Sequence, residues 1–228
     1  MADALLRRFE SSSLKSTVRI ADLGCGTGYL LGQLIERGFD DLHGFDIARE
    51  MLTMAGSTTQ IESDRLIEAD LQALPVPDDQ FDIVFSNASI QWCNTASAAN
   101  EIRRVLCPGG RGFISTFGPQ TLQQWRSVFE SHGHTSVHQF DSCSQLTKTF
   151  EAADLSLNQI DAKLVSQTFD NVKDMFDSIR KLGASNAAAS RKPISKSVFQ
   201  SIQNEFAQRL AKDGVLTLTY EAFSFEVS

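Results

Sequence analysis

Apolar runs of strand length alternate with apolar positions at helical spacing along most of the chain. In the first run, Val18, Ile20, Ala21 and Leu23 suit a buried strand, and three glycines then permit a tight turn into a helix. Similar runs recur to the end of the chain. The pattern predicts seven strands, at residues 18–23, 41–47, 66–71, 81–86, 112–117, 156–169 and 215–227.

Helical spacing occurs in several of the intervals between these strands. Leu30, Leu31, Leu34 and Ile35 share one helical face, and Gly38 follows as a C-terminal cap. Strands that alternate with helices in this way imply an α/β fold, with a doubly wound, mostly parallel seven-stranded sheet and helices on both sides. The other helices are expected at residues 3–10, 96–106, 121–130 and 142–153, and two more begin at Asp170 and Ser195.

The turn after the first strand is typical of a loop that binds a nucleotide-like ligand. Gly24, Gly26 and Gly28 let backbone amides approach a ligand at the positive end of the following helix. The spacing lacks the third glycine of the dinucleotide fingerprint, and no Lys followed by Ser or Thr marks a phosphate-binding P-loop. A strand-to-helix turn without a ligand is the alternative. Asp22 places an acid two residues before the loop.

Polar side chains also follow the next three strands. Asp46 ends the second strand, where a carboxylate accepts two hydrogen bonds from a ribose diol. Asp70 ends the third strand, and Asn87 follows the fourth. Residues 87–93 continue from the carboxyl end of that strand, where the ligands of open parallel sheets collect. This edge is the predicted catalytic face.

The composition favours a small or protein-borne substrate. With 228 residues, 42% of them hydrophobic, the chain suits one globular domain. The net charge of -7 gives no general attraction to nucleic acid or to anionic membranes. The first residues lack the apolar run of a signal peptide, and no segment approaches the length of a membrane span. We therefore expect a cytoplasmic protein without nucleic-acid or membrane partners.

The cysteines and histidines do not form a recognisable metal motif. The four cysteines are widely spaced without a Cys-x-x-Cys pair, which argues against a zinc site and a disulfide framework. His132, His134 and His138 cluster in sequence, but no cysteine or acid stands near them at ligand spacing. We predict reduced thiols and no bound metal.

These motifs together resemble the class I S-adenosylmethionine-dependent methyltransferases. The stretch Asp22-Leu-Gly-Cys-Gly-Thr-Gly is similar to the family's first motif, whose acid contacts the cofactor's amino group directly or through water. Asp46-Ile-Ala-Arg-Glu-Met-Leu resembles the motif in which apolar residues after the acid flank the adenine, and Asp70-Leu resembles the motif that binds the adenine amino group. The resemblance implies that S-adenosylmethionine is bound by Asp22, Gly24, Cys25, Gly26, Gly28, Asp46, Ile47, Met51, Asp70, Leu71 and Asn87.

Three later stretches narrow the resemblance. They are Ser86-Asn-Ala-Ser-Ile-Gln-Trp-Cys, Thr116-Phe-Gly-Pro-Gln-Thr-Leu, and Ser178-Ile-Arg-Lys-Leu-Gly-Ala-Ser-Asn with Leu216-Thr-Leu-Thr-Tyr-Glu-Ala-Phe. They look like the malonyl-[acyl-carrier protein] O-methyltransferase family of biotin synthesis, over nearly the whole chain. The resemblance implies methyl transfer to the free carboxylate of malonyl-acyl carrier protein or malonyl-coenzyme A. The products are a methyl ester and S-adenosylhomocysteine.

Two features depart from the resemblance. The class I family normally joins its sixth and seventh strands by a short hairpin, whereas two predicted helices intervene here. We therefore predict a single domain over residues 1–228, with a helical substrate lid inserted at 170–213. Members of the narrower family usually carry a further N-terminal segment, with a Phe and a Tyr, that folds over the cofactor. This chain begins too late to include it, so we expect either a shortened chain or a different closure of the site.

The implied substrate needs orientation more than deprotonation. A carboxylate with a reference pKa near ~4 is ionised at neutral pH, so no general base is required. Arg180 is the first candidate to orient one carboxylate oxygen, because a guanidinium matches carboxylate geometry. Gln91 and Trp92 are expected to shape the pocket from the fourth strand. Basic lid residues such as Lys192 either meet an acidic carrier protein or form a solvated loop.

Two other hypotheses stay open. A methyltransferase for another small acid or a quinone precursor shares every motif up to Gly110. A methyltransferase-like assembly factor that modifies or chaperones a respiratory-complex subunit shares much of the lid pattern, including Gly-x-Ser-Asn followed by Arg-Lys. Turnover of a malonyl thioester distinguishes the enzyme from both.

Overall fold

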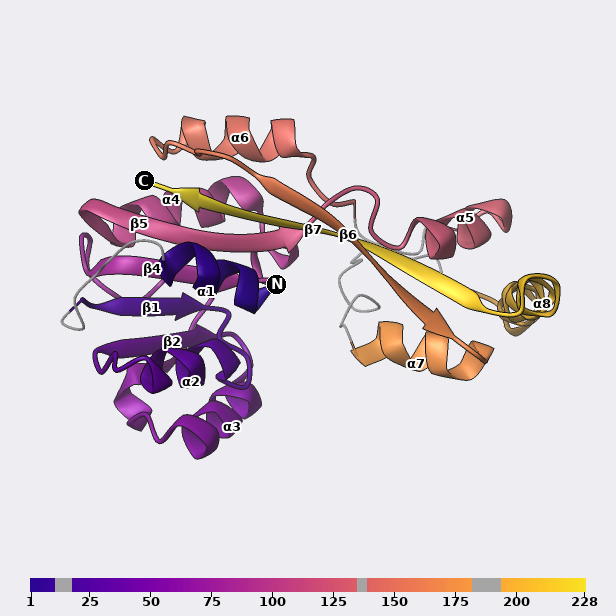
Figure 1. Cartoon of the computed structure of the whole chain (residues 1–228), viewed down its shortest axis with the longest axis horizontal. Coiled ribbons are helices and arrows are strands. Elements are labelled where there is room, and N and C mark those ends of the chain that lie inside the picture. The colour runs from indigo at the N-terminus through magenta and orange to yellow at the C-terminus, as the bar shows by residue number, and fades with distance from the viewer. Residues whose placement is uncertain (11–17, 135–138, 182–193) are drawn as a thin grey trace. The chain divides into compact units, whose positions relative to one another are not determined.

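Seven strands form one sheet in the computed structural model, which describes residues 1–10, 18–134, 139–181 and 194–228 (Figure 1). The strand order is β3-β2-β1-β4-β5-β7-β6. The strands are β1 Ile20–Leu23, β2 Leu42–Asp46, β3 Leu66–Glu68, β4 Phe81–Asn87, β5 Leu106–Phe117, β6 Asp161–Phe169 and β7 Leu216–Val227. The helices are α1 Ala2–Glu10, α2 Tyr29–Glu36, α3 Arg49–Thr59, α4 Thr95–Val105, α5 Gln123–Ser131, α6 Cys143–Ala152, α7 Val172–Lys181 and α8 Lys196–Asp213, with short 3-10 helices η1 Ser63–Arg65 and η2 Ile90–Trp92.

The first five strands are parallel, as predicted. β1 lies between β2 and β4, with Leu23 opposite Phe45 and Asp22 opposite Phe85. β3 pairs in parallel with β2, and β5 pairs in parallel with β4. Figure 1 shows β7 running in the opposite direction to β5. The predicted doubly wound, mostly parallel seven-stranded sheet is confirmed.

Alternate side chains along the strands enter two different cores. Ile20 and Phe85 pack on one face with residues of α1 and α2, whereas Ala21 and Val84 pack on the other face with residues of α4 and α6. This alternation follows from the period of two along a strand. Helices therefore cover both faces of the sheet. The polar residues of the predicted site lie instead at the ends of the strands.

The chain divides into two compact units. The first comprises Met1–Phe117, Asp141–Ala162 and Phe223–Ser228, and the second comprises Gly118–Phe140 and Lys163–Ala222. An aromatic cluster forms the centre of the second unit. Trp125 stacks on Phe129 and Phe206, with ring centroids 4.7 and 5.5 Å apart, and meets Phe176 edge-on at 4.6 Å. The second unit includes α5 as well as the predicted lid, and the prediction of a single domain stays a prediction.

Several element boundaries differ from the expected ones. β5 begins at Leu106 rather than Gly112, because Leu106 already pairs with Phe81 before the register shifts to Ile83 opposite Arg111. β3 stops at Glu68, two residues before Asp70. No element was expected at α3. The sixth strand, expected at 156–169, begins at Asp161, and this last strand of the sheet is exposed up to residue 168.

No helix in the described part of the chain has both the length and the apolar content to cross a bilayer.

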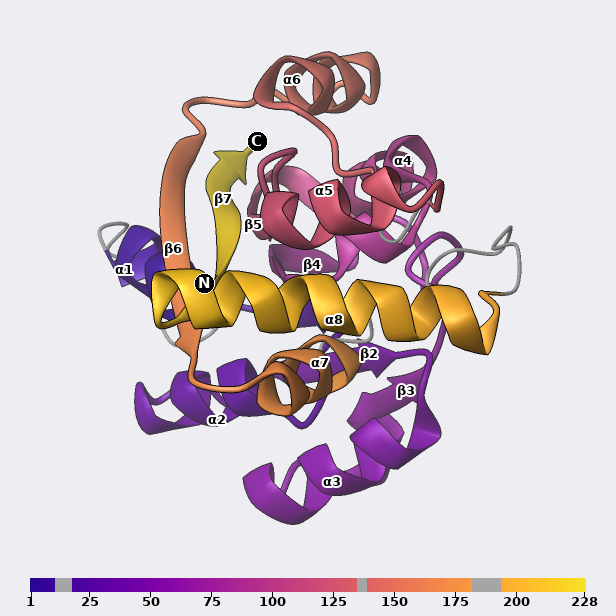
Figure 2. The same ribbon diagram turned by 90° about the vertical axis from the view of Figure 1, so that its right-hand side faces the viewer.

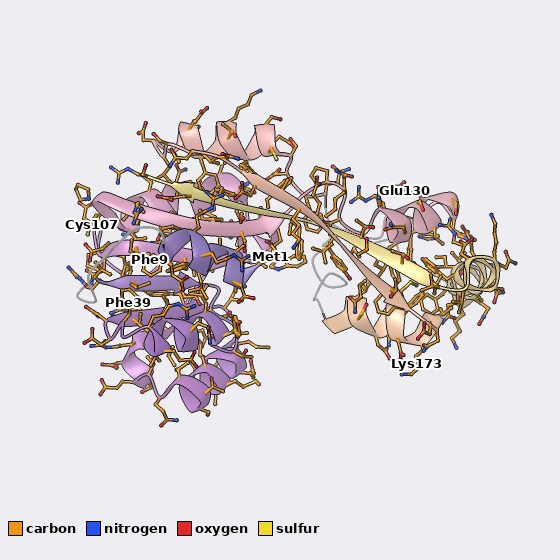
Figure 3. All side chains as sticks on the ribbon, viewed as in Figure 1. Met1, Phe9, Phe39, Cys107, Glu130 and Lys173 are labelled. Carbon is orange, nitrogen blue, oxygen red and sulfur yellow. The ribbon has the colours of Figure 1, made fainter. Side chains whose placement is uncertain are left out.

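Phe9 packs helix α1 against three other aromatic rings. Phe9 is 3% exposed, and its centroid lies 5.2 Å from that of Phe39, 5.3 Å from Phe85 and 5.5 Å from Phe113 (Figure 3). Phe9→Ala therefore lowers the free energy of unfolding by about 3–5 kcal/mol, measured by urea denaturation. Phe9→Leu fills most of the cavity and costs less. A loss below about 1 kcal/mol for the alanine variant would contradict this packing.

Candidate functional site

The predicted cofactor residues lie at the carboxyl ends of β1, β2 and β4 in the first unit. Residues 24–28 connect β1 to α2. β2 ends at Asp46, and β4 ends at Asn87. Because β1 is flanked by β2 and β4, these ends share one edge of the sheet.

The three loop glycines have positive φ angles, and their surroundings differ. A Cβ on Gly24 (φ 75°) would lie 2.2 Å from the Oγ of Ser89, so only glycine fits there. A Cβ on Gly28 (φ 82°) would meet Ala55 and Thr59 of α3 at 3.0 Å, so this glycine lets the two helices approach. A Cβ on Gly26 (φ 54°) would have no described atom within 4 Å. The loop therefore borders open space at Gly26.

The loop amides mostly donate within the protein. The N–H groups of Gly24 and Cys25 donate to the carbonyl of Phe45 at 2.7 and 2.9 Å. The N–H of Gly26 donates to the carboxylate of Asp46 at 2.9 Å, and that of Gly28 donates to the carbonyl of Cys25 at 3.0 Å. These four N–H groups are therefore engaged within the protein, and the contact of the loop with a ligand stays a prediction. Such a loop suits a ligand without a phosphate group.

Asp22 is buried and lacks a full set of hydrogen bonds. It is 1% exposed, and its Oδ1 atom has no hydrogen-bond partner among the described residues. Burial, and secondarily the negative charge of Asp46, raise the pKa of Asp22 to about 7. A buried carboxylate oxygen without a donor is costly, so this atom is suited to a cationic or hydrogen-bond-donating ligand.

Asp46 is oriented by two backbone N–H groups. Its oxygens accept hydrogen bonds from Gly26 and Ala48, each at 2.9 Å. Each carboxylate oxygen has a second lone pair for a ligand hydroxyl. Next to it, the apolar side chains of Ile47 and Met51 are 69% and 38% exposed. Exposed apolar groups beside an oriented carboxylate suit a ligand with both a diol and a flat apolar ring.

The remaining predicted cofactor residues differ in exposure. Asp70 is exposed and accepts a hydrogen bond from the backbone N–H of Gln72 at 2.9 Å, while Leu71 is buried. Cys25 is also buried, and burial together with the charges of Asp22 and Asp46 raises the pKa of its thiol. The thiol therefore stays protonated and is no nucleophile.

The segment after β4 is fixed in a strained conformation. Ala88 has a φ of 53°, and its N–H donates to the carbonyl of Ser115 at 3.0 Å. Gln91 is 5% exposed: its Nε2 donates to the carbonyl of Ala88 at 2.6 Å, and its Oε1 accepts from Thr116 at 3.1 Å. Asn87 Oδ1 accepts a hydrogen bond from Ser115 at 2.8 Å. Non-glycine residues with positive φ persist where neighbours hold them, often at functional sites.

Two candidate substrate residues are solvent-accessible. Trp92 follows this segment in the first unit and is 39% exposed. Arg180 lies on α7 of the second unit, where its side chain is 66% exposed and donates to Asp177 at 2.9 Å. The structure therefore brings the cofactor candidates, Gln91 and Trp92 together in the first unit and describes Arg180 within the second. Lys192 lies outside the described residues.

Within the described ranges, no three His, Cys, Asp or Glu side chains are grouped as for a metal. His132 pairs with Glu205 at 3.1 Å in the second unit. His138 lies outside the described residues.

Sequence reasoning missed the residues that brace the loop after β3. Glu101 accepts a hydrogen bond from the N–H of Leu74 at 2.5 Å and contacts Arg104 at 2.6 Å. Arg104 donates to the carbonyl oxygens of Leu74 and Val76 at 3.1 and 2.7 Å. The Glu-x-x-Arg spacing at 101–104 was the available signal, because residues three apart share a helix face.

The comparisons with known proteins agree with this geometry. A family model described as "Methyltransferase domain" matches residues 21–114. The malonyl-[acyl-carrier protein] O-methyltransferase of Halorhodospira halophila is 33% identical, over 97% of this chain and 77% of the relative. The chain belongs to the malonyl-[acyl-carrier protein] O-methyltransferase family. Membership makes it an S-adenosylmethionine-dependent methyltransferase, as the motifs predicted.

Solved structures show the same fold. The YcgJ protein of Bacillus subtilis superimposes with a TM-score of 0.71 at 18% identity, covering 100% of this chain and 98% of that one. Phosphoethanolamine N-methyltransferase 2 of Haemonchus contortus, in complex with S-adenosyl-L-methionine, gives a TM-score of 0.58 at 18% identity. The match covers 98% of this chain and 51% of the other.

The site residues fit S-adenosylmethionine. The unpartnered oxygen of Asp22 suits a charged amino group, and Asp46 suits a ribose diol. Ile47 and Met51 offer apolar surface for adenine, and Gly26 leaves open space beside the loop. The individual assignments remain predictions, since each is inferred from the side chains alone.

The buried charge of Asp22 makes stability depend on pH. Its folded pKa of about 7 exceeds the ordinary value of 3.8, so the unfolded state releases this proton first as the pH rises. In cofactor-free protein, the stability of Asp22→Asn relative to the parent therefore increases between these pH values, by roughly 4 kcal/mol at most. Urea unfolding across this range measures the difference. A difference that does not change with pH would sink the assignment.

The glycines are separable by substitution. Gly24→Ala lowers stability by about 2–4 kcal/mol because its Cβ overlaps Ser89, and adding Ser89→Gly restores part of that loss. Gly26→Ala meets no described atom, so it costs only about 1 kcal/mol in stability but weakens S-adenosylhomocysteine binding. Thermal unfolding and calorimetry measure both effects. Equal stability losses for the two single variants would contradict the description of the loop.

Proposed function

We propose that this chain transfers a methyl group from S-adenosylmethionine to the free carboxylate of malonyl-acyl carrier protein, as a step of biotin synthesis. The observation that carries the proposal is the 33% identity to a relative named malonyl-[acyl-carrier protein] O-methyltransferase, which extends over 97% of this chain. The extension of this sequence match into the second unit matters, because class I methyltransferases with different substrates share only the cofactor-binding half of the chain. A cytoplasmic location fits the four cysteines, all of which are free.

The proposed reaction requires no general acid or general base. Bound S-adenosylmethionine supplies a methyl group on a positively charged sulfur, and as the new O–CH3 bond forms, the S–CH3 bond breaks and its electron pair stays on sulfur. The substrate carboxylate is already ionised at neutral pH, so no proton is transferred. Rate acceleration comes from alignment and water exclusion, which together contribute on the order of 7 kcal/mol in favourable cases.

The cofactor-facing residues are assigned to positioning the methyl donor. We assign Asp22 to the amino group and Asp46 to the ribose hydroxyls, with Ile47 and Met51 against adenine and Asp70 at its amino group. These roles agree with the orphan oxygen of Asp22 and the N–H groups that orient Asp46.

The substrate-facing residues are assigned different tasks. We assign Gln91 to shaping the pocket by fixing the backbone of Ala88, because its amide is buried and bonded at both ends. Trp92, which is partly exposed, forms a wall. We assign Arg180 to one oxygen of the malonyl carboxylate. Its bond to Asp177 uses Nη1, and a guanidinium has further donors for a second carboxylate.

Mass spectrometry tests the proposed function directly. Malonyl-acyl carrier protein incubated with this chain and S-adenosylmethionine gains the mass of one methylene group, and alkaline hydrolysis of the ester removes it. Asp22→Asn abolishes the gain because it cannot bind the cofactor's amino group as an anion. Arg180→Ala lowers kcat/KM by at least about tenfold, through loss of a charge-assisted hydrogen bond. Cofactor binding without any mass gain would contradict the proposal and favour an assembly factor.

A further inference from the structure

Charge is distributed unequally between the two units. The second unit contains 10 of the 21 Lys and Arg residues but only 7 of the 28 Asp and Glu residues. The first unit contains the other 11 bases and 21 acids. An acidic chain with a net charge of -7 therefore includes a unit of net positive charge.

Grooves border helix α8 on two sides. Figure 2 shows α8 lying between α5 and α7, and it contacts both. The groove toward α7 has a volume of about 360 Å³ and includes Lys173, Arg180, Gln200 and Gln203. The groove toward α5 has a volume of about 650 Å³ and includes His132, Gln208, Arg209 and Lys212. Asn204 lines both grooves.

Basic side chains flank the amide-rich ridge of α8. The side chains of Lys173 and Arg180 are 82% and 66% exposed on α7, where Lys173 is labelled in Figure 3. On the other flank, the side chain of Arg209 is 40% exposed, and Lys212 is exposed. We call this surface the α8 face, defined by Lys173, Arg180, Arg209, Lys212 and the amides of Gln200, Gln203, Asn204 and Gln208.

Acids lie among the basic side chains of the α8 face. Asp177 contacts Lys173 at 2.8 Å and Arg180 at 2.9 Å. Glu205 contacts Arg209 at 2.7 Å and His132 at 3.1 Å. Burial would raise the pKa of Glu205, but its hydrogen bonds outweigh this effect and lower the pKa, so Glu205 stays ionised. Asp174 of α7 also acts on Lys173, and Asp213 follows Lys212 at the end of α8. The positive charge that attracts a partner is therefore that of the second unit as a whole, with its ten bases and seven acids.

The polar character of this face indicates a transient, charged partner. Among the described residues, the large exposed apolar side chains lie outside α5, α7 and α8. An anionic membrane surface usually engages apolar side chains as well as cations. A small acidic protein is recognised well by cations around neutral hydrogen-bonding groups, since complementary charge accelerates association.

We propose that the α8 face docks the acidic surface of the carrier protein that bears the malonyl group. The inference rests on the proposed function and adds to it a recognition surface for the protein part of the substrate. Arg180 contributes to the face, but the test leaves it unchanged because it is also assigned to the substrate carboxylate.

Charge reversal tests this docking surface. Lys173→Glu with Lys212→Glu raises KM for malonyl-acyl carrier protein at least tenfold with little change in kcat, and raising the salt concentration reduces the difference. The matched control is Arg103→Glu with Lys148→Glu, two exposed residues of the first unit, which changes the net charge equally and leaves KM unchanged. Both double variants retain the activity of the parent on the malonyl thioester of N-acetylcysteamine, which has no carrier protein.

Three outcomes would overturn the proposal. They are an unchanged KM in the Lys173/Lys212 variant, an equal loss on both substrates, and charge-dependent binding to phosphatidylglycerol vesicles in place of the carrier protein. If the unmodified chain methylates neither substrate, the proposed function fails, and titration of malonyl-acyl carrier protein then tests docking separately. Binding that weakens only in the Lys173/Lys212 variant supports the α8 face, and equal binding by all variants overturns it.

Discussion

The buried carboxylate of Asp22 is the constraint on which the site depends. Its position at the end of β1 removes it from water, and Asp46 adds a second negative charge nearby, which is why its pKa rises to about 7. The folded chain satisfies this group only in part, because Oδ1 has no donor within the described structure. A ligand that brings positive charge to this position replaces the favourable interactions with water that the carboxylate lost on folding. The same feature therefore lowers the stability of the free protein and, if Asp22 binds the cofactor as we propose, favours cofactor binding.

The glycine loop also influences which ligand can bind, because its backbone N–H groups donate hydrogen bonds within the protein. Phe45 and Asp46 accept the N–H groups of Gly24, Cys25 and Gly26, so these donors are already engaged. A phosphate group needs several such donors, whereas S-adenosylmethionine contains no phosphate group. The arrangement explains physically why a loop that resembles nucleotide-binding turns suits a cationic cofactor.

The sequence predicted the sheet and the order of its polar strand ends because both follow from periodicity. It did not predict the hydrogen bonds of the glycine loop, since spacing places glycines but does not orient N–H groups. The exposure of β6 depends on its place at the edge of the sheet, which alternation within one strand does not specify. The contact of Arg180 with Asp177 follows helix spacing and was predictable. The grooves on both sides of α8 could not be predicted, because they depend on how α5, α7 and α8 pack together.

Proton release on binding tests the central claim most directly. Titration calorimetry with S-adenosylhomocysteine, in buffers of different ionisation enthalpy, counts the protons released per site. If Asp22 has a pKa of about 7 and binds a charged amino group, nearly one proton is released near pH 6, and almost none near pH 8. Tight binding near pH 6 without proton release would contradict the account, because Asp22 would then not ionise to receive the cofactor.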